Sequence, residues 1–211
     1  NYNALTKRLE MLSNSARNLS QMKQRTERLF DERIGALPKK VYMLGAEYTP
    51  LEFAHSVCMR GEYLAMTSFT HHRFGEAFVL EVPDNYSNEL YYNVPIDVMM
   101  KRIERSLRTG HPVCWEGDTS ELGFDFKRGV AELTKQRPYT QKQRQIEFEN
   151  HHTTDDHCMV LIGIAHDENG KRYYIAKNSW GTGNQYGGLM YLSDQYVMMK
   201  TVAIVVKNIN M

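Results

Sequence analysis

The sequence predicts an α+β fold, in which a helical lead-in segment over residues 1–40 precedes a β-rich lobe over residues 41–211. Three observations carry this prediction. Apolar residues recur at helical spacing near the N-terminus, short β-branched and aromatic runs follow, and two apolar runs flank an Asn-Gly turn near the C-terminus. A chain of 211 residues that is 42% hydrophobic can build one core with such an appendage.

Residues 4–34 have the pattern of one long amphipathic helix, with Lys, Arg and Gln on the face opposite the apolar stripe. The stripe advances in alternating steps of four and three residues: Leu5, Leu9, Leu12, Ala16 and Leu19. Gly35 and Pro38 are expected to end the helix. We expect the stripe to dock on the chain's own core; a coiled-coil partner helix is the alternative.

The middle of the chain alternates short helices and strands. Thr49 and Glu52 flank Pro50-Leu51 in a capping-box pattern, which predicts a helix to about Arg60. A second helix is expected between Asn93 and Gly110. Strands are expected at residues 63–69, 77–82 and 112–115, with a loop carrying His71 and His72 between the first two. Residues 119–150 are polar and irregular, and they predict a long loop or insertion.

The two apolar runs near the C-terminus predict a β-hairpin. Residues 158–165 are expected to form a strand buried on both faces, and residues 171–178 return after the turn at 166–170. If paired residues have numbers that sum to about 335, His157 and Asn178 lie opposite each other on one face. A slip of one residue would place them on opposite faces. Two further strands are expected at residues 189–192 and 202–206.

A histidine beside an asparagine side chain suits the chemistry of a thiol nucleophile. The imidazole can take the thiol proton and later return it to a leaving amine. The asparagine carbonyl accepts the other ring N–H and fixes the tautomer of the imidazole. The less specific interpretation of His157 and Asn178 is a hairpin with a hydrogen-bonded histidine and a turn-forming asparagine.

The local sequence resembles the papain superfamily of cysteine peptidases. Asp156-His157-Cys158-Met159-Val160 is followed, 21 residues after the histidine, by Asn178-Ser179-Trp180-Gly181. With residues 49–53, 92–97 and 110–118, the likeness extends to the bleomycin hydrolase and aminopeptidase C branch over roughly residues 40–207. The resemblance implies a papain-like lobe. In it His157 is general base and acid, Asn178 orients it and Trp180 covers their hydrogen bond.

The resemblance also implies a cysteine nucleophile and an oxyanion glutamine upstream of residue 1, on an N-terminal lobe of the same precursor or on a second chain. Cys158 is adjacent to His157 on a strand, so the two side chains point to opposite faces. Cys114 is expected on a strand and Cys58 late in a helix, and neither position has the helix N-terminus that favours a thiolate. We expect three reduced thiols and no disulfide framework.

Acidic residues flank the expected site. Glu116 and Asp118 follow the Cys114 strand, and Asp156 precedes His157. They are candidates for binding the free amine of a peptide substrate, which would suit an aminopeptidase; surface carboxylates are the alternative. The branch carries a C-terminal arm that restricts cleavage to the amino terminus, and the residues after Val206 do not supply one, so endopeptidase and aminopeptidase both stay open.

Composition argues against several other functions. A net charge of +1 with mixed signs does not favour nucleic acid or a membrane surface, and no run of 18 apolar residues is present. No cofactor or metal is expected, although residues 151–157 are rich in His and Asp. The branch implies a homo-oligomer and a cytoplasmic location. The competing function is a catalytically inactive papain-like protein that binds peptides or acts as a scaffold.

Overall fold

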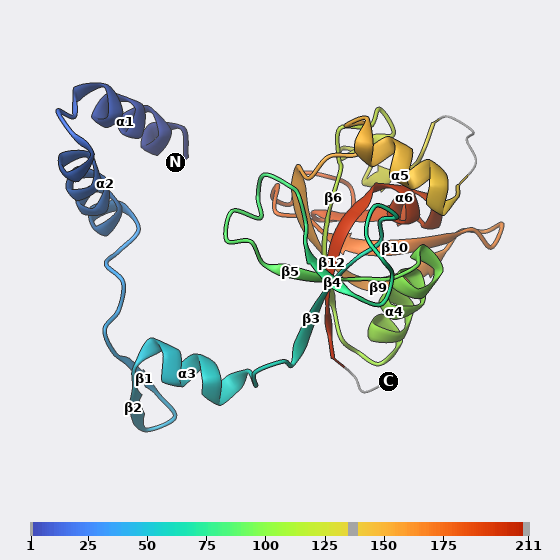
Figure 1. Ribbon diagram of the computed structural model, residues 1–211, viewed down its shortest axis with the longest axis horizontal. Coiled ribbons are helices and arrows are strands. Elements are labelled where there is room, and N and C mark those ends of the chain that lie inside the picture. The colour runs from blue at the N-terminus through green and yellow to red at the C-terminus, as the bar shows by residue number, and fades with distance from the viewer. Residues whose placement is uncertain (1, 135–138, 209–211) are drawn as a thin grey trace. The chain divides into compact units, whose positions relative to one another are not determined.

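The computed structural model describes residues 2–134 and 139–208, and the chain divides into two compact units, residues 1–59 and 60–211. The first unit contains helices α1 (Tyr2–Ser15), α2 (Leu19–Arg33) and α3 (Pro50–Val57) and the antiparallel strands β1 (Val41–Met43) and β2 (Ala46–Tyr48) (Figure 1). The expected division into residues 1–40 and 41–211 stays a prediction.

The helix expected over residues 4–34 is two helices, so that prediction is wrong in its continuity. Asn18 has an extended backbone, and its side-chain Oδ1 accepts a hydrogen bond from the backbone N–H of Gln21 at 2.9 Å. Asparagine satisfies a free N–H at a helix start well, so a new helix begins at Leu19. The apolar periodicity continues across this break, and therefore did not reveal it.

The capping box before α3 is confirmed. The Thr49 hydroxyl accepts from the N–H of Glu52, and the Glu52 carboxylate accepts from the N–H of Thr49 at 2.7 Å. The rings of Tyr48 and Phe53 lie 5.8 Å apart on either side of the cap, where a hydrophobic staple is expected. The helix ends at Val57, three residues before the predicted end.

The second unit is built on a ten-stranded sheet in the order β4-β5-β3-β12-β6-β9-β10-β11-β8-β7. Figure 1 labels strands β3, β4, β5, β6, β9, β10 and β12 of this sheet. Neighbouring strands are antiparallel except for the pairs β3–β5 and β8–β11. The strands are β3 (Tyr63–Thr67), β4 (Ala77–Val79), β5 (Leu90–Asn93), β6 (Val113–Gly117), β7 (Phe124–Asp125), β8 (Val130–Ala131), β9 (His157–His166), β10 (Arg172–Lys177), β11 (Leu189–Ser193) and β12 (Thr201–Lys207).

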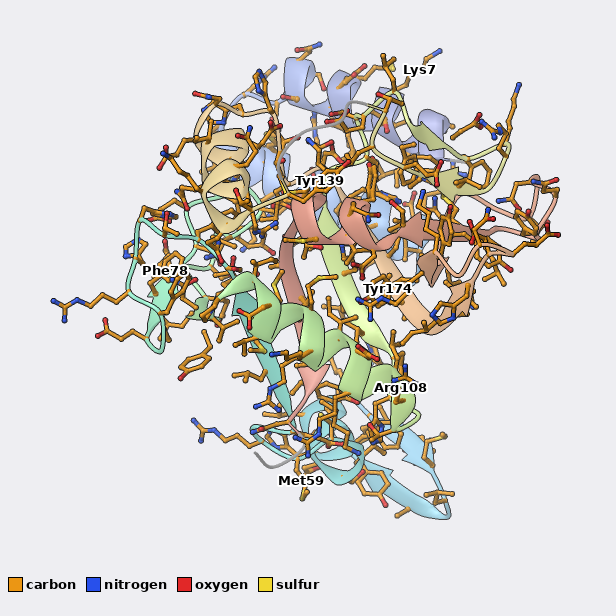
Figure 2. All side chains as sticks on the ribbon, turned by 90° about the vertical axis from the view of Figure 1, so that its right-hand side faces the viewer. Lys7, Met59, Phe78, Arg108, Tyr139 and Tyr174 are labelled. Atoms are coloured by element: carbon orange, nitrogen blue, oxygen red, sulfur yellow. The ribbon has the colours of Figure 1, made fainter. Side chains whose placement is uncertain are left out.

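The core of this unit lies between the sheet and helix α4 (Ile96–Arg108), which ends near the labelled Arg108 in Figure 2. The apolar stripe of α4 meets buried residues of β6, β9 and β12, and Tyr174 of β10 belongs to the same cluster. Trp115 is fully buried there, and its indole N–H donates to the Thr201 hydroxyl at 2.7 Å. The sheet and this helix therefore form a rigid base for the residues at the strand ends.

The segment expected to be a long loop, residues 119–150, instead contains β7, β8 and helix α5 (Gln141–Glu149); residues 135–138 within it lie outside the described residues. The buried side of α5 is polar, so the sequence lacks the apolar periodicity that would have indicated the helix. Arg144 is fully buried and donates to the carbonyls of Ser68, Met198 and Met199, and burial lowers its pKa to about 9.

Strand β9 is buried on one face only, which corrects the expectation that both faces are covered. Met159 and Leu161 point into the core, whereas Val160 is 39% and Ile162 46% exposed. Across residues 2–134 and 139–208, none of the helices combines the length and the apolar character that crossing a bilayer requires.

Gly117 at the end of β6 allows a close approach that a side chain would block. A Cβ there would lie 2.2 Å from the carbonyl oxygen of Lys200 and 2.6 Å from the Trp115 ring. We expect Gly117→Ala to lower the free energy of unfolding by about 2 kcal/mol, because the backbone at Lys200, directly before β12, must move. Gly183→Ala is the control, since nothing lies within 4 Å of its Cβ position. Urea unfolding measures both, and equal effects would contradict the packing argument.

Candidate active site

His157 and Asn178 lie at the open end of the β9–β10 hairpin. His157 is the first residue of β9, Asn178 follows the last residue of β10, and the His157 Nε2 is 2.8 Å from the Asn178 Oδ1. Asn178 is only 7% exposed. The predicted proximity of these two side chains is therefore present in the structure, while their role in catalysis stays a prediction.

The hydrogen bonds of Asn178 fix the tautomer of His157. The backbone N–H of Ser179 donates to Asn178 Oδ1 at 2.7 Å, and Asn178 Nδ2 lies 3.4 Å from the Met190 sulfur, so the amide oxygen faces the histidine. Since an amide oxygen only accepts, His157 Nε2 must carry the proton. The neutral ring then keeps a lone pair on Nδ1, which is the nitrogen able to take a proton from another group.

A β-bulge places the two side chains on one face. Paired residue numbers sum to 338 at Arg172–His166 and to 337 at Lys177–Val160, because β9 has one extra residue, Ile162, opposite the Ile175–Ala176 step. Residues directly opposite each other in an antiparallel pair have their side chains on the same face. Two residues whose numbers add to an odd sum therefore share a face only where the numbers of directly paired residues also add to an odd sum. His157 and Asn178 sum to 335 and share a face because of the bulge.

The pairing differs by two residues from the one expected from the sequence. At a sum of 337, His157 is two residues away from the position directly across from Asn178. Asn178 lies beyond the last paired residue of β10, and its side chain still reaches the imidazole. The expected shared face is present, and the expected direct opposition is not.

Trp180 packs against the imidazole. The centroids of the Trp180 and His157 rings are 4.8 Å apart, and Trp180 is 48% exposed. The edges of Phe124 and Phe126 flank the indole at 5.6 and 5.5 Å. Trp180 therefore covers one side of the His157 ring, while its role in shielding the hydrogen bond between His157 and Asn178 stays a prediction. The two phenylalanines were not predicted, because they lie in the segment interpreted as a loop; the spacing Phe-Asp-Phe of a short strand edge was the available signal.

Neither cysteine of the second unit is placed to act with His157. Cys58 follows α3 in the first unit and is exposed. Cys158 points to the outer face of β9, away from the core face that carries His157, and Cys114 of β6 shares that outer face. Burial and the neighbouring Glu116 carboxyl raise the pKa of Cys158 to about 11 and also raise that of Cys114. Both thiols are therefore protonated near neutral pH.

The three candidate substrate-binding acids occupy different environments. Glu116 faces the outer side of β6, opposite Cys158. Asp118 is fully buried, and its carboxylate accepts from the N–H groups of Ser120 and Thr154. Asp156 is exposed, and its carboxylate accepts from the N–H and hydroxyl of Thr119. Only Glu116 and Asp156 have surface from which to meet a substrate.

Glu116 is a half-buried carboxyl with an acidic neighbour. Burial raises its pKa to about 8, and the nearby Asp155 carboxyl adds to the rise. Burial also raises the pKa of Asp155. Because two carboxylates this close resist ionising together, the pair holds a proton at neutral pH. The outer face of β6 and β9, opposite the face that carries His157, therefore has one negative charge fewer than its composition suggests.

His71, His72 and Glu81 form the one group of metal-ligand type within the described residues. Hydrogen bonds account for it. Gln145 Oε1 accepts from the Thr70 N–H, so the Gln145 amide nitrogen, which is 3.0 Å from His71 Nδ1, donates to that nitrogen. His71 Nε2 then carries the proton and donates to Glu81 at 3.1 Å. A nitrogen in this state offers no lone pair to a metal.

Comparison with known proteins places the chain in a family. The model of the Peptidase C1-like family matches residues 11–211. Aminopeptidase E of Lactobacillus helveticus is 25% identical over 170 residues, which cover 74% of this chain and 38% of that protein. The crystal structure of PepW from Lactobacillus rhamnosis shares the fold with a TM-score of 0.66 at 15% identity, over 97% of this chain and 52% of PepW. The chain thus spans about half or less of the length of these relatives.

These matches confirm the α+β papain-like fold and the resemblance to C1 peptidases. The matched residues include both His157 and Asn178 as well as the first unit from Met11 onward. The helical segment is therefore part of the family pattern rather than an unrelated extension.

The raised pKa of Glu116 makes the stability of the chain depend on pH. A carboxyl with a folded-state pKa above its unfolded value binds more protons when folded, so the free energy of unfolding falls as pH rises from about 5 to 8. We expect Glu116→Gln to reduce this fall, as measured by urea unfolding at pH 5, 6, 7 and 8. Glu168→Gln, in the exposed turn, should leave the fall unchanged. The same pH dependence in both variants would refute the assignment.

Proposed function

The chain belongs to the Peptidase C1-like family, and on that basis we propose that it supplies the histidine and asparagine of a cysteine-peptidase active site. The observation that carries the proposal is the 2.8 Å hydrogen bond between His157 Nε2 and Asn178 Oδ1, with the amide oxygen also held by Ser179. This bond orients the ring and leaves the Nδ1 lone pair available as a base.

In the proposed reaction, His157 Nδ1 takes the proton of a cysteine thiol, and the thiolate attacks the carbonyl carbon of a peptide. The imidazolium gives this proton to the leaving amine as the C–N bond breaks, and a thioester remains. His157 then takes a proton from water, whose oxygen attacks the thioester, and the acid product and the thiol are released. Asn178 holds the ring through both halves, and Trp180 limits access of water to one side of it.

The nucleophile is proposed to lie outside residues 1–211, on an N-terminal lobe of the same protein or on a second chain. Two observations support this. Cys114 and Cys158 have raised pKa values and face away from His157. The relatives that match this chain are about twice its length or more, which leaves room for a further lobe.

An aminopeptidase is the finer form of the proposal. One matched relative is named Aminopeptidase E, and the exposed carboxylate of Asp156 directly precedes His157 at the start of β9. A negative group near the scissile bond would attract the protonated amine of a substrate. Asp118 is not included, because its carboxylate is buried and already accepts hydrogen bonds. Glu116 is not included either, because it lies on the face of the sheet opposite His157 and its raised pKa keeps it largely protonated at neutral pH.

The peptidase proposal predicts where an epoxide inhibitor of thiol proteases reacts. In the purified enzyme we expect the added mass on a cysteine outside residues 1–211, by intact mass and peptide mapping. His157→Ala should lower kcat/KM for peptide hydrolysis by about 10³-fold and slow the labelling, because general-base catalysis typically contributes 10²–10⁴-fold. Asn178→Ala should lower kcat/KM by about 10–100-fold, since the base remains but loses its orientation.

His166→Ala is the matched control, since His166 ends the same strand and is exposed. It should leave hydrolysis unchanged. Labelling of Cys58, Cys114 or Cys158 would refute the assignment of the nucleophile. If nothing is labelled and no peptide is cleaved, the chain has the inactive, peptide-binding or scaffold role instead.

The aminopeptidase form predicts a difference between substrates. Asp156→Asn should raise the KM for peptides with a free amino terminus more than for the same peptides with an acetylated one. The reason is that only the free amine carries the charge that the carboxylate attracts. Glu168→Gln should change neither KM. Equal rises for both substrates would leave the peptidase proposal intact and remove the amine-binding one.

A further inference from the structure

Lys200 is a lysine with almost no access to solvent. It ends helix α6 (Asp194–Lys200), and its side chain is 2% exposed. The Nζ lies 2.6 Å from the His152 carbonyl, 3.2 Å from the Thr153 hydroxyl and 2.7 Å from the Glu121 carboxylate. The carboxylates of Glu147 and Asp118 are slightly farther, at 3.7 and 3.9 Å. A buried ammonium is tolerated only with such pairing.

Two of the hydrogen-bond partners belong to the segment that leads into His157. Residues 152–156 connect α5 to β9, and His157 is the next residue. The backbone N–H groups of His152 and Thr153 both donate to the Glu147 carbonyl at the end of α5. The Lys200 ammonium donates to the carbonyl of His152 and to the hydroxyl of Thr153. The segment is therefore held between α5 and the Lys200 ammonium.

Asp118 connects this cluster to the strand beside His157. Its N–H donates to the Lys200 carbonyl at 3.0 Å, and its carboxylate accepts from the Thr154 N–H at 3.0 Å. Asp118 directly follows Gly117, the residue paired with His157 across β6 and β9. Two residues after Thr154, Asp156 binds Thr119 of the same β6 extension. The start of β9 is thus fixed on both sides of the Gly117–His157 pair.

We propose that Lys200 is a positioning residue for His157, acting through residues 152–156 and Asp118. This inference rests on the proposed function, because the orientation of His157 matters for catalysis and does not matter for a scaffold. It assigns Asp118 to the support of the site, in place of the substrate contact that the sequence suggested. The bulge sets which face His157 occupies, and Lys200 sets where along the sheet the strand begins.

The arrangement is specific to an ammonium at this point. The three acidic neighbours come from two parts of the chain: Asp118 and Glu121 from the connection between β6 and β7, and Glu147 from α5. Without the positive charge, the buried Asp118 and Glu147 would repel each other and draw in water or protons. The segment they border, residues 152–154, would be the first to move, because it lacks a strand partner.

The test compares Lys200→Met with Val206→Ala in the active enzyme. Val206 is 3% exposed and lies in β12 away from residues 152–156, so it reports general loss of stability. We expect Lys200→Met to lower kcat by about 10-fold or more with KM changed less than about 3-fold, because a small displacement of a catalytic group costs up to about 100-fold in rate. Val206→Ala, compared with Lys200→Met at an equal loss of thermal stability, should keep kcat within about 2-fold of that of the unmodified enzyme.

A second readout needs no activity. Trp180 lies against His157, so its fluorescence should change with pH as His157 gains a proton. The emission of Trp180 is obtained as the difference between the protein and its Trp180→Phe variant. His157→Gln should abolish the pH-dependent change. Lys200→Met should reduce the amplitude of this pH-dependent change. If Lys200→Met does not fold, Thr153→Val serves instead, since it removes one acceptor of the ammonium and keeps the side-chain volume.

An unchanged fluorescence titration in Lys200→Met or Thr153→Val, or a fall in kcat no larger than in Val206→Ala, would overturn the positioning role. If the unmodified protein cleaves no peptide at all, the proposed function fails instead. The fluorescence titration then still decides whether Lys200 positions His157.

Discussion

The face on which His157 lies depends on a single residue that has no partner in the sheet. Ile162 is the extra residue of β9, and it shifts the pairing with β10 by one. On the His157 side of the bulge, Met159 and Leu161 fill the core, and on the other side Ile164 packs against it. The apolar core and the His157–Asn178 hydrogen bond require the same shift, so packing and chemistry select one arrangement of the hairpin.

Polar groups then place the ends of the strands. The buried Arg144 and Gln145 hold α5 against residues 68–71 after β3 and against the end of α6. Lys200 joins three carboxylates beside the segment that precedes β9. Burying charges costs nearly as much as their attraction returns, so such groups add little net stability. Their contacts are directional, however, and direction is what a base needs if its lone pair is to meet a thiol. The apolar core supplies most of the stability, and the polar contacts supply the position.

The sequence was informative where local chemistry decides the structure. The Thr49–Glu52 capping box, the Asn-Gly turn and the histidine and asparagine motifs were all predictable, because each depends on neighbours in the chain. Helix α5, the Ile162 bulge and the role of Lys200 were not. Each depends on contacts with residues far along the chain, as with Arg144 and Ser68 or Lys200 and Asp118, and none changes the apolar periodicity that reveals an element. The break at Asn18 was a local signal, obscured because the stripe continued through it.

The bulge also determines how the hairpin can change length during evolution. The turn at Asp167–Gly170 projects beyond the paired residues, so an insertion there adds to the loop and leaves the strands in register. A single residue gained or lost between His157 and Leu161 would instead rotate His157 out of the site or force Met159 out of the core. The separation of 21 residues between the histidine and the asparagine is therefore not itself under constraint. Homologous sequences should tolerate gaps of varied length at the turn and almost none in the strand segments beside the two residues.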